Sequence, residues 1–125
     1  MTFAKWVFRL AGIYGLLAVL PMYALERQLG IDYPPAINHP EYFYGFVGVV
    51  VAWQLAFIIM GRAPARYRPL MLPAMVEKFS FAGAVLMLYL QGRLSGLTLG
   101  FAAIDFVLGV LFLVSFALTR ESNHG

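Results

Sequence analysis

The sequence predicts an all-α membrane protein, a four-transmembrane-helix bundle with both termini in the cytoplasm. Its composition is the first reason: of 125 residues, 62% are hydrophobic and 12% are charged, whereas soluble domains have about 45–50% apolar and about 25% charged residues. The apolar residues also form runs that are long enough to span a bilayer. Finally, lysine and arginine are concentrated before the first run, between the second and third runs, and after the fourth. The positive-inside rule predicts this pattern if those segments lie in the cytoplasm.

The first apolar run covers residues 6–25 and is interrupted only by Arg9 and Pro21. A basic start followed by an apolar stretch is also typical of a cleaved signal peptide. Residues 22–24 are Met-Tyr-Ala, however, and this is a poor small-x-small cleavage site. We therefore expect the run to be retained as the first span. The polar segment 26–39 that follows is expected to form an external loop.

The second span is expected at residues 40–60. Pro40 suits the first turn of a helix because its missing N–H costs nothing there, and Glu41 suits the positive end of the helix dipole. Residues 61–69 hold three arginines and two prolines, which favours a tight basic loop. The third span is expected at residues 70–90, starting at Pro69 or Pro73. A short turn precedes the fourth span at residues 97–118, and the whole chain, 1–125, forms a single membrane domain.

Orientation follows from counting the basic residues that flank the spans, because lysine and arginine in short loops stay on the cytoplasmic side. One side carries six of them: Lys5, Arg9, Arg62, Arg66, Arg68 and Arg120. The other side carries two, Arg27 and Arg93. The N-terminus, the basic loop and the C-terminus are therefore predicted to be cytoplasmic, and this placement explains the net charge of +3 without nucleic-acid binding.

Charged residues within a span are costly, and they are the first candidates for a ligand or proton site. Glu77, Lys78 and Asp105 lie within the expected spans. Lys78 is expected to extend its ammonium to the cytoplasmic surface. Gln54 lies at about the depth of Glu77, so a hydrogen bond between them is possible, either as packing or as part of a site.

Asp105 is the deepest acid and is too short to reach water. The only basic residue that is an obvious partner at the outer end is Arg93, about three turns away. Function and structural bonding are equally good interpretations of this carboxyl. The depths of Glu77 and Asp105 are expected to differ by about 8–14 Å, which is too far for a direct proton relay without water.

Two surface features suggest partners. Arg62, Arg66 and Arg68 could bind anionic lipid headgroups, although a role in setting topology is sufficient to explain them. Gly96, Gly100 and Ala103 form a small-residue stripe that allows another helix to approach closely, either within the bundle or in a homodimer. Asp105 points away from this stripe.

Metal and cofactor chemistry is not indicated. The chain has no cysteine, which excludes disulfides and thiolate chemistry. Asp32, His39 and Glu41 lack a recognisable ligand spacing. No phosphate-binding loop or haem-ligating pattern is present, so we expect no cofactor and no metal.

Several short segments together resemble small four-helix bacterial inner-membrane proteins of the DoxX-like kind. They are Ala52-Trp53-Gln54, the basic loop from Gly61 to Pro69, the Glu77-Lys78 pair, and Asp105 followed by Leu108-Gly109-Val110-Leu111-Phe112. The likeness covers most of the chain but includes no catalytic motif. It implies a protein of the bacterial inner membrane, sometimes tied to redox or stress physiology.

Three functions remain open at this point. The leading hypothesis is a non-enzymatic membrane component that binds a small apolar ligand or a partner between its helices. The first alternative is a small proton-coupled transporter. Against it, the first span has no acid and the basic bias favours a single orientation. The second alternative is a membrane-embedded lipid or sterol isomerase that uses Glu77 and Asp105 as acid–base groups.

Overall fold

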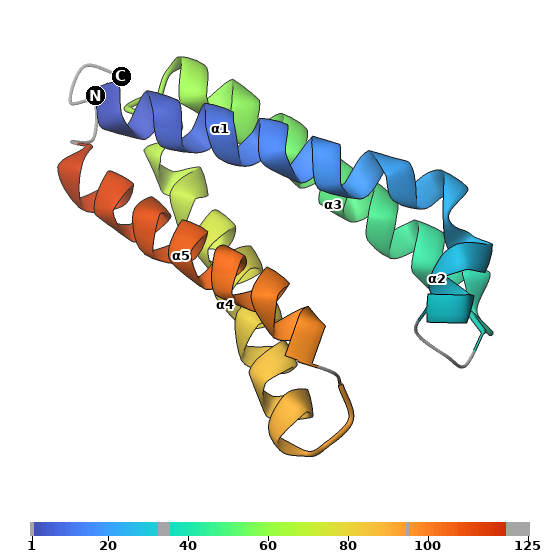
Figure 1. The fold of residues 1–125 in the computed structure, drawn as a ribbon. Coiled ribbons are helices and arrows are strands. Elements are labelled where there is room, and N and C mark those ends of the chain that lie inside the picture. The colour runs from blue at the N-terminus through green and yellow to red at the C-terminus, as the bar shows by residue number, and fades with distance from the viewer. Residues whose placement is uncertain (1, 33–35, 95, 120–125) are drawn as a thin grey trace.

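The computed structural model describes residues 2–32, 36–94 and 96–119, and every regular element within these ranges is helical (Figure 1). In order, the elements are α1 (Thr2–Val19), η1 (Leu20–Ala24), α2 (Glu26–Asp32), α3 (Pro40–Arg62), η2 (Arg68–Leu70), α4 (Met71–Leu90) and α5 (Gly96–Leu118). Four helical stretches are long and apolar enough to cross a membrane: Thr2–Ala24, Pro40–Arg62, Arg68–Leu90 and Thr98–Leu118. The prediction of an all-helical chain with four such helices is confirmed.

Prolines mark the beginnings of two of these helices. Pro40 is the first residue of α3, where its missing N–H leaves no hydrogen bond unmade. Before α4, the 3₁₀ turn η2 contains Pro69, and Pro73 falls in the first turn of α4 itself. The third span therefore uses both of its possible starting prolines, one in the 3₁₀ turn and one in the α-helix.

The segment expected to be an external loop is partly helical. Residues Glu26–Asp32 form α2, in which the Gln28 side chain donates a hydrogen bond of 2.9 Å to Asp32 four residues later. Such i,i+4 pairs support a helix. The connection between the first two spans therefore contains a short helix, which its polarity did not indicate. Pro34, Pro35 and Arg120 lie outside the described residues.

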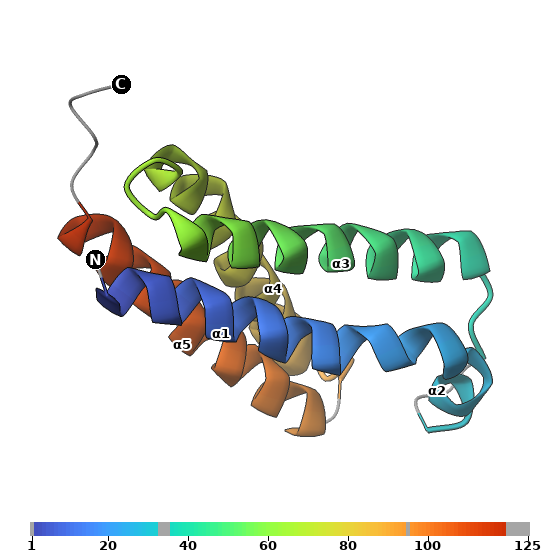
Figure 2. The same ribbon diagram turned by 90° about the horizontal axis from the view of Figure 1, so that it is seen from above.

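The helices are arranged as two antiparallel pairs. α1 packs along α3, α4 packs along α5, and the two pairs meet mainly through α1 and α5. They are close together at the end of the molecule where α1 and α4 begin and α3 and α5 end, which we call the closed end. Toward the opposite end, the open end, the pairs diverge (Figures 1 and 2).

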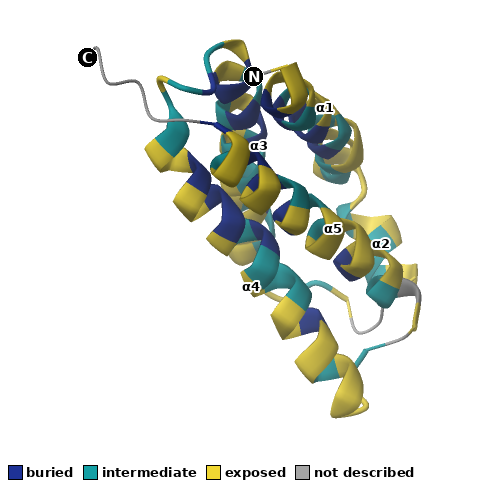
Figure 3. Ribbon diagram, turned by 90° about the vertical axis from the view of Figure 1, so that its left-hand side faces the viewer, coloured by how far each residue is buried: buried dark blue, intermediate teal, exposed yellow. Residues whose placement is uncertain are grey.

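The hydrophobic core lies at the closed end, where all four long helices contribute to it. Phe8 of α1 stacks on Phe112 of α5 with ring centroids 4.3 Å apart, and Phe57 of α3 meets Phe112 edge-on at 5.0 Å. The other buried members are small or flexible: Ala4, Ala11, Met60, Met71, Ala74 and Met75. Buried residues are concentrated in this half of the molecule (Figure 3).

Close packing of α1 against α3 depends on glycine. A Cβ atom at Gly12 would lie 2.6 Å from the carbonyl oxygen of Gln54 and 2.6 Å from Cγ1 of Ile58. A Cβ atom at Gly15 would overlap the side-chain amide of Gln54. Small residues allow helix backbones to approach in this way, which is a common device in membrane helix pairs.

The outer surface of the helices is strongly apolar. Leu17 on α1 is 73% exposed and Leu90 on α4 is 72% exposed, and large apolar side chains are exposed along α3 and α5 as well. A soluble monomer rarely exposes contiguous apolar area on this scale. Together with the four spanning-length helices, this surface indicates an integral membrane protein.

Candidate functional site

The most unusual group in the structure is a buried lysine between two carboxylates. The side chain of Lys78 on α4 is 4% exposed. Its Nζ atom lies 3.5 Å from Oε2 of Glu77 and 3.5 Å from Oδ1 of Asp105 on α5. We call these three residues the ion trio.

The register between α4 and α5 brings the ion trio together. The ring of Phe79 lies over Gly109, so that a Cβ atom there would be 2.7 Å from Cε1 of Phe79. Phe79 also meets Phe106 edge-on at 5.7 Å. Because α5 runs antiparallel to α4, Asp105 lies one turn, about 6 Å, closer to the open end than Gly109. The long side chain of Lys78 reaches Asp105 from the neighbouring helix.

Helix α3 also contributes to the surroundings of the ion trio. The Phe57 ring of α3 lies 5.4 Å from Nζ of Lys78, within the range of a cation–π contact. The ion trio therefore adjoins the aromatic core, to which Phe57 belongs. The side chains of Glu77 and Asp105 remain 21% and 16% exposed.

The charges of the ion trio do not balance. Two carboxylates and one ammonium carry one negative charge in excess when all three are ionised. Oε2 of Glu77 is buried and has no hydrogen-bond partner among the described residues. An uncompensated charge in apolar surroundings is costly. One more positive charge, from either a proton or a cation, would balance the charge of the ion trio.

The structure corrects three sequence-based predictions about these residues. Glu77 and Asp105 were expected to differ in depth by about 8–14 Å, but a carboxylate oxygen of each lies 3.5 Å from the same ammonium. Lys78 was expected to reach the surface at the closed end, but it pairs with Asp105 inside the bundle because that carboxylate is within reach. Arg93 was the only obvious basic partner for Asp105, but its guanidinium donates to Gln91 at 3.3 Å instead. The partner of Asp105 is Lys78, which also connects Asp105 to Glu77.

Gln54 is fully buried, but it does not form the predicted hydrogen bond with Glu77. Its Nε2 atom donates to the carbonyl oxygen of Val50, one turn earlier on α3, at 3.0 Å. Its side chain lies against Gly15, and its Oε1 atom has no hydrogen-bond partner within the described part of the chain. Gln54 therefore belongs to the α1–α3 contact.

The three arginines of the basic loop differ from one another. Arg62 and Arg66 are exposed and remain available to lipid headgroups. Arg68 donates from Nε to the carbonyl oxygen of Phe116 at 3.1 Å, and its guanidinium lies 3.6 Å from the centre of the Phe116 ring. A cation at the last turn of a helix satisfies free carbonyls and complements the dipole. Arg68 therefore holds the end of α5 in place, a role the sequence did not indicate.

The small-residue stripe faces away from the other parts of the chain that the structure describes. A Cβ atom at Gly96 or Gly100 would meet no other atom within 4 Å, and Ala103 is exposed. Of the two interpretations of the stripe, packing within the bundle does not occur among the described residues. The face is open to lipid or to a second protein.

Comparison of the chain with protein-family models, with curated proteins and with solved structures gives no match. The resemblance to DoxX-like proteins stays a prediction. Conclusions about function therefore depend on the geometry of the ion trio and on the four apolar helices.

Proposed function

We propose that this protein lies in the bacterial inner membrane with both termini in the cytoplasm. The arrangement of basic residues supports this orientation. Lys5 and Arg9 at the start of α1 and the arginines of the basic loop lie at the closed end, whereas Arg27 and Arg93 lie at the open end (Figure 1). The positive-inside rule assigns the more basic end to the cytoplasm.

Reporter fusions test this orientation. A reporter after Gly125 or within residues 62–68 should read as cytoplasmic, and one within residues 28–35 as external. Replacing Arg62, Arg66 and Arg68 together by alanine should weaken the preference, because the basic residues that set it are then nearly equal on the two sides. A cytoplasmic reading for the reporter at 28–35 in the unaltered chain would contradict the proposal.

Within that membrane, the protein acts as a non-catalytic binding component for a small, largely apolar ligand that carries one positive charge. The observation that carries this proposal is the buried position of Lys78 between Glu77 and Asp105. Replacing a buried ion pair by apolar residues is often neutral or stabilising. The stability of the fold therefore does not explain three ionisable groups at this place, whereas binding of a ligand does.

The chemistry of the ligand follows from the surroundings of the ion trio. The excess negative charge favours a cation, and the aromatic ring of Phe57 favours a ligand with an apolar body that delocalises its charge. A strongly hydrated metal ion fits less well, because it would have to exchange its water for very few oxygen atoms.

Tetraphenylphosphonium, an apolar monovalent cation, is a suitable probe. Equilibrium dialysis with the detergent-solubilised protein should show binding that weakens on acidification, since protons compete for the same carboxylates. Asp105→Asn should weaken binding by at least about tenfold, a loss of about 1.4 kcal/mol. Because it also removes the ion pair with Lys78, it should lower the melting temperature as well, so binding is compared at a temperature at which both proteins are fully folded. The matched control is Asp32→Asn, at an exposed acid on α2. Equal binding by both variants would refute the assignment.

The charge imbalance also favours a second candidate, a proton-coupled transporter, because a site that exchanges a proton for a cation needs such an excess. Proteoliposomes separate the two functions. A binding component should hold tetraphenylphosphonium without moving it when a pH gradient is applied. A transporter should accumulate it against its gradient, and Glu77→Gln should abolish this accumulation.

We further propose that the small-residue stripe forms a homodimer contact. Because Gly100 has open space around it, Gly100→Leu should leave the monomer folded and remove the dimer. Gly83→Leu on α4 is the matched control, since that glycine also has no neighbour within 4 Å. Cross-linking in native membranes measures the dimer. Absence of cross-linked dimer in the unaltered protein would refute the proposal.

A further inference from the structure

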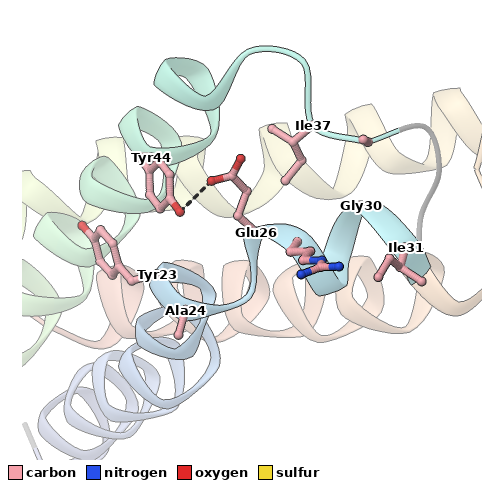
Figure 4. A pocket seen from close by; sticks show the side chains of 9 residues that line it. Tyr23, Ala24, Glu26, Gly30, Ile31, Ile37 and Tyr44 are labelled. Atoms are coloured by element: carbon pink, nitrogen blue, oxygen red, sulfur yellow. Dashed lines mark hydrogen bonds between the residues drawn. The ribbon is translucent and has the colours of Figure 1, made fainter.

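A pocket of about 530 Å³ lies at the open end, away from the ion trio. Its lining combines one acid, one base, two tyrosines and small or apolar residues: Tyr23, Ala24, Glu26, Arg27, Gly30, Ile31, Ala36, Ile37 and Tyr44. These residues come from η1, α2, the segment before α3, and the first turns of α3 (Figure 4). We call it the open-end pocket.

A hydrogen bond fixes the acid of this pocket. The hydroxyl of Tyr44 donates to Oε1 of Glu26 at 2.9 Å (Figure 4). Tyr44 in turn stacks on Tyr23, with ring centroids 6.0 Å apart and planes 16° apart. The second oxygen of Glu26 accepts no hydrogen bond within the described ranges, so the positioned carboxylate keeps acceptor capacity for a ligand.

The base of the pocket is also available. Arg27 is exposed, and it forms no ion pair among the residues whose placement is described. Glu26 and Arg27 are neighbours in sequence and both line the pocket. The pocket therefore presents both a carboxylate and a guanidinium, which matches a ligand that carries one positive and one negative group.

The depth of the pocket indicates where such a ligand comes from. The first spanning stretch ends at Ala24 and the second begins at Pro40, and Tyr44 lies about 6 Å further along α3. In a chain that spans the bilayer, these positions lie at the level of the lipid headgroups. Tyrosine is enriched at this level because its ring is apolar and its hydroxyl is polar.

We propose that the open-end pocket binds a phospholipid whose headgroup carries a phosphate and a primary ammonium, as in phosphatidylethanolamine. Arg27 pairs with the phosphate, and Glu26 accepts hydrogen bonds from the ammonium. Ile31 and Ile37 contact the glycerol and the first acyl carbons. The proposal requires that the chain spans the membrane, but it is independent of its orientation and of what the ion trio binds.

The same groups discriminate among lipids. A phosphatidylcholine headgroup has a quaternary ammonium with no N–H, so it cannot donate a hydrogen bond to Glu26. A phosphatidylglycerol headgroup has a net negative charge and no ammonium, so Glu26 repels it. Because the choline lipid loses a hydrogen bond to a charged group, we expect a preference for the ethanolamine lipid of about tenfold or more.

Native mass spectrometry of the full chain in detergent tests this preference. The protein is given equal amounts of the three lipids with identical acyl chains. Glu26→Gln should reduce retention of phosphatidylethanolamine to the level of phosphatidylcholine, and Arg27→Gln should reduce retention of all three lipids. Matched controls are Glu41→Gln and Arg93→Gln, which alter exposed charges at the same end but outside the pocket.

A soluble competitor distinguishes an intact lipid from a free headgroup. Phosphoethanolamine at the lipid's concentration should not displace the lipid, because it lacks the glycerol and acyl carbons that contact the isoleucines. Displacement would show that the ligand is a soluble zwitterion and would overturn the lipid proposal. Equal retention of the ethanolamine and choline lipids, or identical behaviour of Glu26→Gln and Glu41→Gln, would also overturn it. Unchanged melting temperatures ensure that the variants are folded.

Discussion

Lys78→Met should lower the free energy of unfolding by about 3–5 kcal/mol, because removing one partner of a buried ion pair leaves the remaining charge uncompensated. Here two carboxylates, Glu77 and Asp105, would remain beside an apolar side chain of similar length. The measurement is reversible unfolding in mixed detergent, followed by circular dichroism.

Lys5→Met is the matched control, since Lys5 is exposed near the start of α1. Its effect should stay within about 0.5 kcal/mol, as for most surface substitutions. If Lys78→Met were no more destabilising than Lys5→Met, the ammonium of Lys78 would have to lie in water and the ion trio would not exist as described.

Gly12→Ala should destabilise the fold by about 1–3 kcal/mol, the usual effect of adding atoms to a packed interior. The added methyl would lie 2.6 Å from the carbonyl oxygen of Gln54. This contact is with the backbone of α3, so a side-chain rotation cannot relieve it, and α1 must move away from α3. The change should also lower the melting temperature in detergent.

Gly83→Ala provides a control of opposite sign. No atom lies within 4 Å of a Cβ placed at Gly83, and alanine in a helix interior is favoured over glycine by about 1 kcal/mol. This variant should therefore be as stable as the unaltered protein or slightly more stable. Equal destabilisation by the two substitutions would show that backbone conformation, and not the α1–α3 contact, determines the effect.

The spanning helices could be predicted because a bilayer sets their length and excludes charges over that length. Turn residues and prolines then located most helix ends to within a few residues. The second span, for example, begins at Pro40 as predicted. α2 could not be recognised from apolar pattern, because its short polar sequence has no membrane-spanning run. The divergence of the two helix pairs depends on side-chain packing between distant segments, to which hydropathy is insensitive.

The members of the ion trio were identified individually from the sequence, since each is an ionisable residue within a span. Their pairing was not predicted. It depends on the register in which Phe79 packs over Gly109, and this register sets the reach from Lys78 to Asp105. The predicted hydrogen bond between Gln54 and Glu77 was wrong for a similar reason. The buried side chain of Gln54 faces Gly15 on α1 and not the third span.

The open-end pocket was not predicted at all. Glu26 and Tyr44 are separated by 18 positions, and only the folding of α2 back toward α3 brings them together. The available signal was the tyrosine residues close to a charged segment at a span boundary. That pattern is typical of any membrane interface, so it did not distinguish a binding pocket from an ordinary aromatic belt.

A double-mutant cycle between Lys78 and Asp105 tests the central claim, that these residues form a buried ion pair between α4 and α5. The cycle compares the free energy of unfolding of the unaltered protein, Lys78→Met, Asp105→Leu and the double variant under identical detergent conditions. We expect a coupling energy of about 1–3 kcal/mol, with the double variant more stable than the sum of the single effects implies. Additive effects, to within about 0.5 kcal/mol, would contradict the ion pair.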